Sequence, residues 1–302
     1  MKRTLSLLLC IVMLASVAVL FSSCGGAKEV DFTDYRLVYG NDLSDPAAAE
    51  VQTFADALSK KTGEKIGMKK VNPTGDTDEG DELEILVGNT NRPETAKALK
   101  KVKGHGYIVT VIGSKVVVAG TTNLLTLMAL DYFTETYLGG EESVTMKIAT
   151  EKQSKMEMLE LDNKWSFIHD STLEGSFDQI NVEIQETKKL IDKFADLRAS
   201  SMVVQPDTES RDKEIVVGLA NRDAARELNA VMSVVEYGVS VKNGKIVLPG
   251  LNDGMIVKSL KYFREVVRDS VYESDGEMLV ALPADFTRLL TDTESTHVTD
   301  FP

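Results

Sequence analysis

The sequence is poor in the residues that build disulfide frameworks and metal sites. Its 302 residues include two cysteines, three histidines and one tryptophan. Cys10 lies within an apolar stretch near the start of the chain and Cys24 follows that stretch, so no cysteine pair remains to cross-link the rest. No two histidines have metal-ligand spacing. We therefore expect stability from packed cores alone, with no metal and no cofactor.

Basic residues are also scarce relative to acidic ones. The chain has 34 lysines and arginines against 47 aspartates and glutamates, which gives a formal net charge of −13. An acidic protein repels the phosphates of nucleic acids and of anionic lipid head groups. The composition argues against a nucleic-acid partner, and membrane contact would require an anchor other than surface charge.

The first residues have the pattern of a secretory signal. Lys2 and Arg3 precede the almost wholly apolar residues 5–21, and two serines then lead to Cys24. Residues 1–23 resemble a bacterial lipoprotein signal, in which Cys24 would be lipidated and become the first mature residue. Phe21 stands where that signal usually has leucine, and ordinary secretion is the alternative. We expect an extracytoplasmic protein, anchored to a bacterial membrane through lipid on Cys24.

A long internal repeat is the strongest pattern in the chain. Residues 84–92 read EILVGNTNR, and residues 214–222 read EIVVGLANR. Without a gap, residues 84–137 match residues 214–267 at 16 of 54 positions, where unrelated sequences would match at roughly 3 or 4. A repeat of this length predicts two copies of one small domain rather than a solenoid of short units.

Each copy alternates short apolar strands with amphipathic helices. The first long helix should begin with Asp45 as its cap and stop at Gly63, and Asn243-Gly244 predicts a tight hairpin. The predicted fold is α/β (α+β), with two tandem mixed sheets and helices packed on them. The expected divisions are a tether (24–34), a first domain (35–150), a linker or strand edge (151–164), a second domain (165–284) and a polar tail (285–302).

One stretch of each copy resembles a known domain. The run from Glu84 to Arg92, the Tyr107-x-Val-x-Val strand and the strand of residues 115–120 are similar to the small α/β domain before the barrel of β-hexosaminidases and α-glucuronidases. In those enzymes this domain is non-catalytic, and the acid/base carboxylates lie in the barrel, for which we expect no room here. The resemblance implies a fold and a carbohydrate-associated context rather than an activity.

Each copy has one Asn-Arg pair where a strand should end and a helix begin, Asn91-Arg92 in the first copy and Asn221-Arg222 in the second. They are candidate ligand-binding residues, because an arginine there can grip a carboxylate or a sugar hydroxyl. The structural alternative is that the preceding glycine makes the turn and the asparagine caps the helix. That alternative leaves the arginine unexplained, since a cation at a helix start opposes the helix dipole.

Other candidates are weaker. The tyrosines at 107, 132, 237 and 262 are possible sugar platforms, although their spacing favours packing. The acidic run of residues 75–82 has the wrong spacing for a calcium loop.

Three functions remain open at this stage. The leading hypothesis is a non-enzymatic, cell-surface binding or scaffolding lipoprotein of bacteria, in the carbohydrate-associated context that the resemblance implies. The second is a protein-interaction or structural role in the envelope. The third is an enzyme with an unrecognised glycosidase-like site, for which no carboxylate pair can be chosen without geometry.

Overall fold

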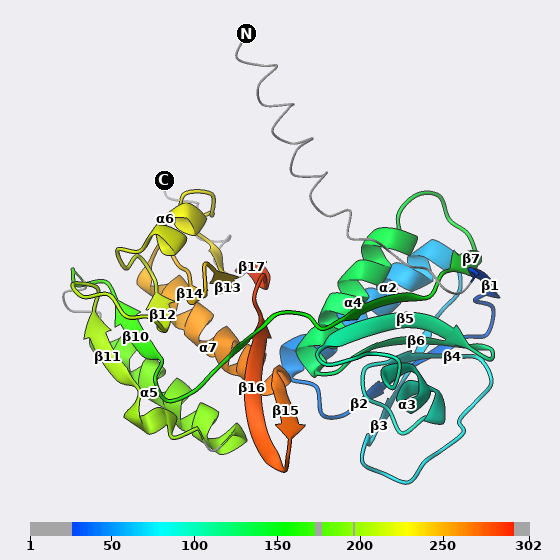
Figure 1. Cartoon of the computed structure of the whole chain (residues 1–302). Helices are drawn as coiled ribbons and strands as arrows, with labels where there is room; N and C mark the ends of the chain where they lie inside the picture. The colour runs from blue at the N-terminus through cyan, green and yellow to red at the C-terminus, as the bar shows by residue number, and fades with distance from the viewer. Residues whose placement is uncertain (1–25, 173–176, 196, 293–302) are drawn as a thin grey trace, which may run out of the picture.

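The computed structural model describes residues 26–172, 177–195 and 197–292. The predicted signal of residues 1–23 and the predicted lipid-bearing Cys24 lie outside these residues. Among the helices it does describe, none has both the length and the apolar character needed to cross a membrane. Figure 1 shows two lobes side by side, one for each copy of the repeat.

The first copy is built on a mixed sheet of six strands in the order β3-β2-β4-β6-β5-β8. Alternate side chains of β4 point to opposite faces of this sheet. Ile85 and Val87 join the core under the helices α2 and α4, whereas Leu86 joins the smaller core under α3. The bounds are β2 (Arg36–Gly40), α2 (Asp45–Thr62), β3 (Gly67–Val71), β4 (Glu84–Val87), α3 (Pro93–Leu99), β5 (Gly106–Ile112), β6 (Lys115–Gly120), α4 (Asn123–Tyr137) and β8 (Glu151–Ser154).

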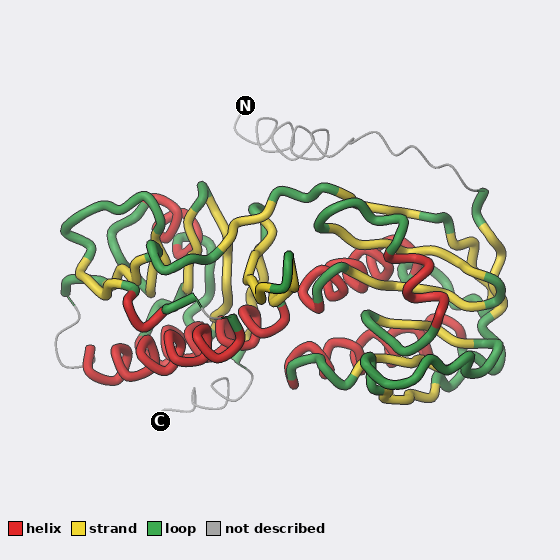
Figure 2. The backbone as a smooth tube through the Cα atoms, turned by 60° about the horizontal axis from the view of Figure 1, so that its bottom comes forward, coloured by secondary structure: helices red, strands yellow, loops and turns green. Residues whose placement is uncertain are grey.

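The second copy repeats this architecture, with a sheet in the order β11-β10-β12-β14-β13-β17. Its long helices α5 and α7 pack along each other, and Figure 2 shows them running together beside the sheet. The bounds are β10 (Ser166–His169), α5 (Phe177–Phe194), the 3-10 turn η1 (Ala199–Ser201), β11 (Val203–Pro206), β12 (Glu214–Val217), α6 (Asp223–Asn229), β13 (Glu236–Lys242), β14 (Lys245–Leu248), α7 (Asp253–Asp269) and β17 (Thr287–Thr291).

Each copy also carries a small antiparallel sheet. In the first, β1 (Lys28–Asp31) pairs with β7 (Thr145–Ile148). In the second, β9 (Met158–Glu160) pairs with β16 (Glu277–Pro283), which also pairs with the additional strand β15 (Val271–Ser274). The fold therefore confirms the predicted mixed α/β architecture in two tandem copies and shows that the repeat begins at β1 and β9, earlier than the sequence identities indicate.

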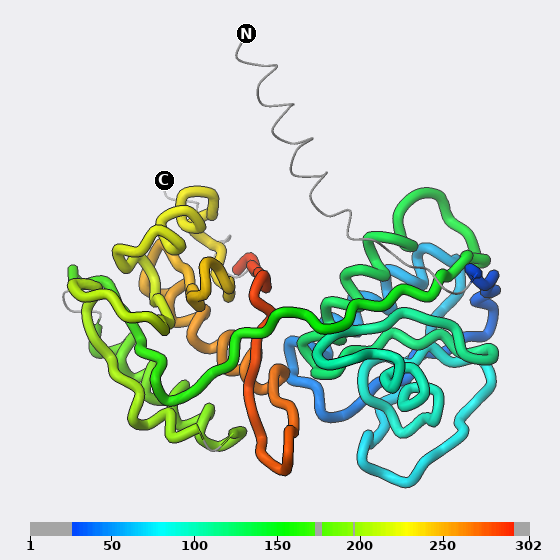
Figure 3. The backbone as a smooth tube through the Cα atoms, in the orientation of Figure 1, coloured from blue at the N-terminus to red at the C-terminus, as the bar shows by residue number. Residues whose placement is uncertain are grey.

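Three segments that were expected to lie outside the two domains contain strands. The expected tether, residues 24–34, holds β1, which pairs with β7. Residues 151–164, expected to be a linker or a strand edge, hold β8 at the edge of the first sheet and β9 in the second copy. Figure 3 shows the chain passing from one lobe to the other along this segment. The expected polar tail, residues 285–302, begins with β17 at the edge of the second sheet. These strands have no clear alternation because they are short and lie at sheet edges, so hydrophobic periodicity misses them.

The ends of α2 follow the expected chemistry with one correction. The cap is Ser44 rather than Asp45, since the Ser44 side chain accepts a hydrogen bond from the Ala47 N–H at 3.2 Å. Gly63 ends the helix in the left-handed conformation, with φ of 73°. Asn243 and Gly244 have φ of 53° and 71°, which confirms the predicted hairpin turn.

The glycine after the third parallel strand of each copy gives a test of the fold. Gly218 has φ of +66°, and a Cβ built on it would lie 2.5 Å from Cδ1 of Ile256 on α7. Gly218→Val should lower the free energy of unfolding by about 2–5 kcal/mol, because left-handed strain and overpacking add together. Urea unfolding would measure the loss.

The matched control for this glycine is Gly67→Val. Gly67 lies in a strand, and a Cβ there meets nothing within 4 Å. If Gly218→Val changes stability no more than the control does, our account of the strand-end turn is wrong.

Candidate binding site between the two copies

The predicted residue Arg92 is the centre of a buried ionic network in the first copy. Its side chain is fully buried, and Nε lies 2.9 Å from Glu84 Oε2 while Nη2 lies 3.1 Å from Glu84 Oε1. Nη1 contacts Asp78 Oδ2 at 2.7 Å and Asn91 Oδ1 at 2.8 Å. Arg36 also forms an ion pair with this carboxylate, with Nη2 at 2.9 Å from Glu84 Oε1. Each guanidinium nitrogen of Arg92 thus has a protein partner.

Burial and hydrogen bonding act in opposite directions on Glu84. Burial alone would raise the pKa of this carboxyl, but hydrogen bonds from Arg92 and Arg36 outweigh it and lower the pKa to about 2. Lys115 adds a third cation, with Nζ 3.5 Å from Glu84 Oε2. The carboxylate stays ionised and fixes the start of β4 to the loop before α3.

The second copy repeats the network with equivalent residues. Arg222 Nε lies 3.0 and 2.9 Å from the two carboxylate oxygens of Glu214, and Lys245 forms an ion pair with the same carboxylate. The remaining Arg222 nitrogens donate to the backbone carbonyls of Asp207, Asn221 and Glu209. Burial is again outweighed by these cations, and the pKa of Glu214 is lowered.

These contacts explain the arginines that the sequence left unexplained. Arg92 and Arg222 themselves occupy the cap positions of α3 and α6, without a capping side-chain hydrogen bond, so the asparagine-cap interpretation is wrong. Asn91 instead donates to the Asp76 carbonyl at 3.0 Å, and Asn221 accepts from Arg226. Ligand binding by the four residues stays a prediction, and a ligand would have to displace these partners.

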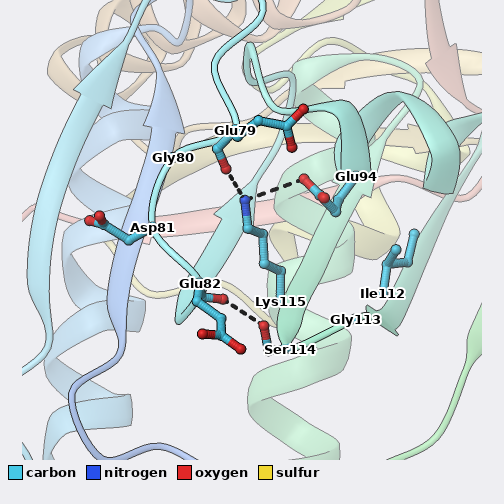
Figure 4. Close-up of a pocket in the computed structure, with 9 residues that line it drawn as sticks. All are labelled: Glu79, Gly80, Asp81, Glu82, Glu94, Ile112, Gly113, Ser114 and Lys115. Atoms are coloured by element: carbon cyan, nitrogen blue, oxygen red, sulfur yellow. Dashed lines mark hydrogen bonds and ion pairs between the residues drawn. The ribbon is translucent and has the colours of Figure 1, made fainter.

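A surface pocket of about 270 Å³ lies beside the first network. Figure 4 shows Lys115 reaching into it, with Nζ bonded to the Glu79 carbonyl and 3.4 Å from Glu94 Oε2. The side chain of Ser114 donates to the Glu82 carbonyl at 2.8 Å on the other side. Among the described residues, Lys115 is the only cation that lines this pocket, and it is already paired.

A second polar cluster joins the two copies. Asp269 at the end of α7 accepts from the N–H of Ser44 at 3.1 Å and from its hydroxyl at 2.5 Å. Arg288 on β17 places Nη2 at 2.8 Å from both oxygens of Asp131 on α4. Its Nη1 lies 2.6 Å from Glu50 Oε2 on α2, an ion pair without hydrogen-bond geometry. One arginine of the second copy therefore connects two helices of the first.

Apolar contacts accompany this cluster. Leu124, at the start of α4 in the first copy, belongs to the core of the second, and Met128 contacts both cores. The ring of His105 meets that of Tyr272 edge-on, with centroids 4.5 Å apart. These contacts set the position of one copy against the other.

Two hollows of about 240 and 280 Å³ open along this contact, and both are lined by Asp131 and Arg288. The Asp131–Arg288 ion pair thus borders both hollows, and we call the two together the inter-copy cleft. Its larger half is lined by residues of α2, α4 and β17. Its smaller half, the tyrosine-side hollow, is lined by Tyr107, Met128, Asp131, Tyr132, Glu135, Asp285, Phe286, Thr287 and Arg288.

Burial governs the titration of the carboxyls at this contact. It raises the pKa of Glu50 to about 7, with Arg288 opposing and Asp131 and Asp269 adding to the rise. It also raises the pKa of Asp269 to about 6 against the two hydrogen bonds from Ser44. The protonated form therefore predominates below about pH 7 for Glu50 and below about pH 6 for Asp269.

The cleft combines residues that sequence reasoning treated differently. Tyr107 and Tyr132 pack against the first core, as their spacing predicts, and both also line the hollow. Sugar stacking on these rings stays a prediction. Arg288 was not selected, because it lies in the expected polar tail and only the pairing of β17 with β13 carries it to the contact. The arginine pairs at 91–92 and 221–222 do not line the cleft.

Among known proteins, no family model and no curated protein matches the chain. Solved structures similar to it include the protein CpGH84D, with a TM-score of 0.31, 11% identity and coverage of 67% of this chain and 32% of that one. Another is the GH20 β-N-acetylhexosaminidase from Streptomyces coelicolor A3(2), with a TM-score of 0.29, 10% identity and coverage of 66% of this chain and 33% of that one. A third is the N-acetyl-β-hexosaminidase of Streptomyces plicatus, with a TM-score of 0.29, 11% identity and coverage of 80% of this chain and 42% of that one.

The chain thus spans 32–42% of the length of these three proteins. Similarity at this TM-score carries no argument about function, so the function must be inferred from the site.

Proposed function

We propose that this chain is a non-catalytic binding module that holds an extracytoplasmic ligand in the inter-copy cleft. A lipid on Cys24 would keep it at a bacterial membrane. The observation that carries the proposal is the cleft itself, where aromatic rings and hydrogen-bonding side chains from both copies line the two hollows. Rings with adjacent polar groups suit a sugar, which presents an apolar face and a rim of hydroxyls.

The distribution of charged networks supports binding in the cleft rather than at the strand ends. The Glu–Arg–Lys network occurs in both copies and satisfies its own charges, as expected of a support for the fold. The cleft occurs once, since it needs both copies. A scaffolding role for a protein partner is the second candidate, favoured by the outward-facing apolar side chains of Val231 and Val234, which are 80% and 64% exposed.

The test is titration calorimetry against a panel of polysaccharides and cell-wall fragments. A chain that begins at Gly25 retains every described element and lacks the predicted lipid site. We expect saturable binding that Tyr132→Ala weakens about tenfold, because a stacked ring contributes on the order of 1 kcal/mol beyond its buried area.

Tyr39→Ala is the matched control for the loss of a partly buried tyrosine. Its ring lies under Lys70 outside the cleft, and it should bind like the unchanged chain. Absence of binding across the panel, or equal binding by the Tyr132 variant, would refute the proposal and direct attention to a protein partner.

A further inference from the structure

In the second copy a lysine ammonium lies beside a pair of tyrosine rings. The rings of Tyr237 and Tyr262 lie 6.4 Å apart and edge-on. The ammonium of Lys258 on α7 lies over the Tyr237 ring, 5.9 Å from its centroid, and 2.6 Å from Asp292 Oδ2. This copy therefore supplies its own ammonium to a tyrosine face and a carboxylate.

The first copy has the same aromatic pair without that ammonium. Tyr107 and Tyr132, each 130 positions before its counterpart, have ring centroids 6.2 Å apart. Met128 stands where the second copy has Lys258, and it lines the tyrosine-side hollow. The only cation among the lining residues is Arg288, which Asp131 and Glu50 already engage.

The hollow also presents unengaged acceptors. Tyr107 is 9% exposed, and its hydroxyl makes no hydrogen bond to a described residue. Burial, with the charges of Glu135 and Asp285 adding to it, raises the pKa of this hydroxyl to about 12. The hydroxyl therefore stays neutral, and its oxygen can accept a hydrogen bond. The carboxylates of Glu135 and Asp285 are exposed at the rim, and neither is in an ion pair with a described residue.

We propose that the tyrosine-side hollow binds a primary ammonium group, carried by an amino sugar or by a linear polyamine. This inference rests on the proposed binding function and names its ligand class. The ammonium would lie over the Tyr107 ring, as Lys258 lies over Tyr237. It would donate to the Tyr107 hydroxyl and to the carboxylates of Glu135 and Asp285.

The test uses calorimetry on the chain that begins at Gly25, at a pH below the pKa of the ligand amine. The probes are a glucosamine oligomer, the N-acetylglucosamine oligomer of equal length, and spermidine. N-acetylation removes the charge and leaves the sugar ring, so the first two probes isolate the ammonium. We expect the glucosamine oligomer or spermidine to bind at least about tenfold more tightly than the acetylated oligomer.

Two variants locate the site. Met128→Lys places an ammonium where the second copy has one and should weaken binding of the charged probes about tenfold or more by occupying the hollow. Glu135→Gln combined with Asp285→Asn removes two rim charges and should weaken it about five- to tenfold. Glu141→Gln combined with Glu142→Gln removes two exposed charges outside the cleft lining and should leave binding unchanged.

Thermal unfolding of each variant separates lost binding from lost folding. Equal or tighter binding of the acetylated oligomer would overturn the ammonium inference and leave the binding function standing. Binding of spermidine alone, sensitive to both variants, would keep the ammonium site and remove the sugar. Charged-probe binding that neither folded variant changes would overturn the site, and no binding by any probe would refute both proposals.

Discussion

Glu84→Gln is expected to lower the free energy of unfolding by about 3–5 kcal/mol, since it removes one partner from a buried ion pair. The side chains of Glu84 and Arg92 are both 0% exposed, and Arg36 and Lys115 point at the same carboxylate. The amide would remove the buried carboxylate that these three cations share, leaving each with a single, more peripheral carboxylate, and would turn a donor toward a guanidinium. Urea unfolding, followed by circular dichroism, measures the loss.

The repeat provides an internal comparison for this prediction. Glu214→Gln removes the equivalent carboxylate, which has two cationic partners, and should also destabilise its copy by several kcal/mol. Glu82→Gln is the control, since Glu82 is exposed and has no ion-pair partner among the described residues; its change should stay within about 0.5 kcal/mol. A loss below about 1 kcal/mol for Glu84→Gln would show that the network does not support the fold.

Acidification from about pH 8 to pH 5 should stabilise the contact between the copies, because Glu50 and Asp269 are more easily protonated when folded. Burial raises the pKa of Glu50 from 4.5 to about 7 and that of Asp269 from 3.8 to about 6. For a raised pKa, the favourable contribution is complete below the unfolded value and disappears as the pH rises through the folded value. Each group contributes up to about 3 kcal/mol over that interval.

Protonation of Glu84 has the opposite effect on stability, and it takes place in a lower pH range. The folded pKa of Glu84 is lowered to about 2, so its contribution is complete above 4.5 and disappears as the pH falls toward 2. The groups facing the two interface carboxyls are Arg288, Asp131, Arg268 and Glu265, together with the Ser44 hydroxyl. The three shifts together predict greatest stability at about pH 4, where the stabilisation lost by protonating Glu84 balances the stabilisation gained by protonating Glu50 and Asp269.

The measurement is the melting temperature between about pH 4 and pH 8 for the unchanged chain and for Glu50→Gln combined with Asp269→Asn. The variant should lose most of the rise in stability between pH 8 and pH 5, while Glu142→Gln should retain it. Parallel profiles for the unchanged chain and the double variant would contradict the assignment of these carboxyls to the contact.

Repetition is what made the fold accessible from the sequence. The uninterrupted repeat, which contains β4 and β12, was recognisable because apolar strands, turn glycines and amphipathic helices recur at one spacing. The edge strand β17 was missed, and the segment of β8 was left open between a linker and a strand edge, because a short edge strand is specified by its neighbour rather than by its own pattern. The cap of α2 was misplaced by one residue, since Ser44 and Asp45 are both good caps.

The candidate site was harder to predict, because it lies between elements that are distant in the chain. The identity of Arg92 and Arg222 across the copies pointed to importance, and the structure places both in internal networks. Arg288 has no local signal, since its meaning depends on Glu50 and Asp131 in the other copy. Met128 becomes informative only beside Lys258, a comparison that requires knowing which ring that lysine covers.

The most direct test of the central claim is amide chemical-shift mapping of the chain that begins at Gly25, titrated with each member of the glycan and amine panel. Our account predicts saturable shifts around Tyr107, Tyr132 and Thr287, on both sides of the inter-copy cleft. Shifts confined to residues 89–94 and 219–224 would place binding at the strand-end arginines instead. The absence of saturable shifts with every panel member would contradict the assignment of a binding function to the cleft.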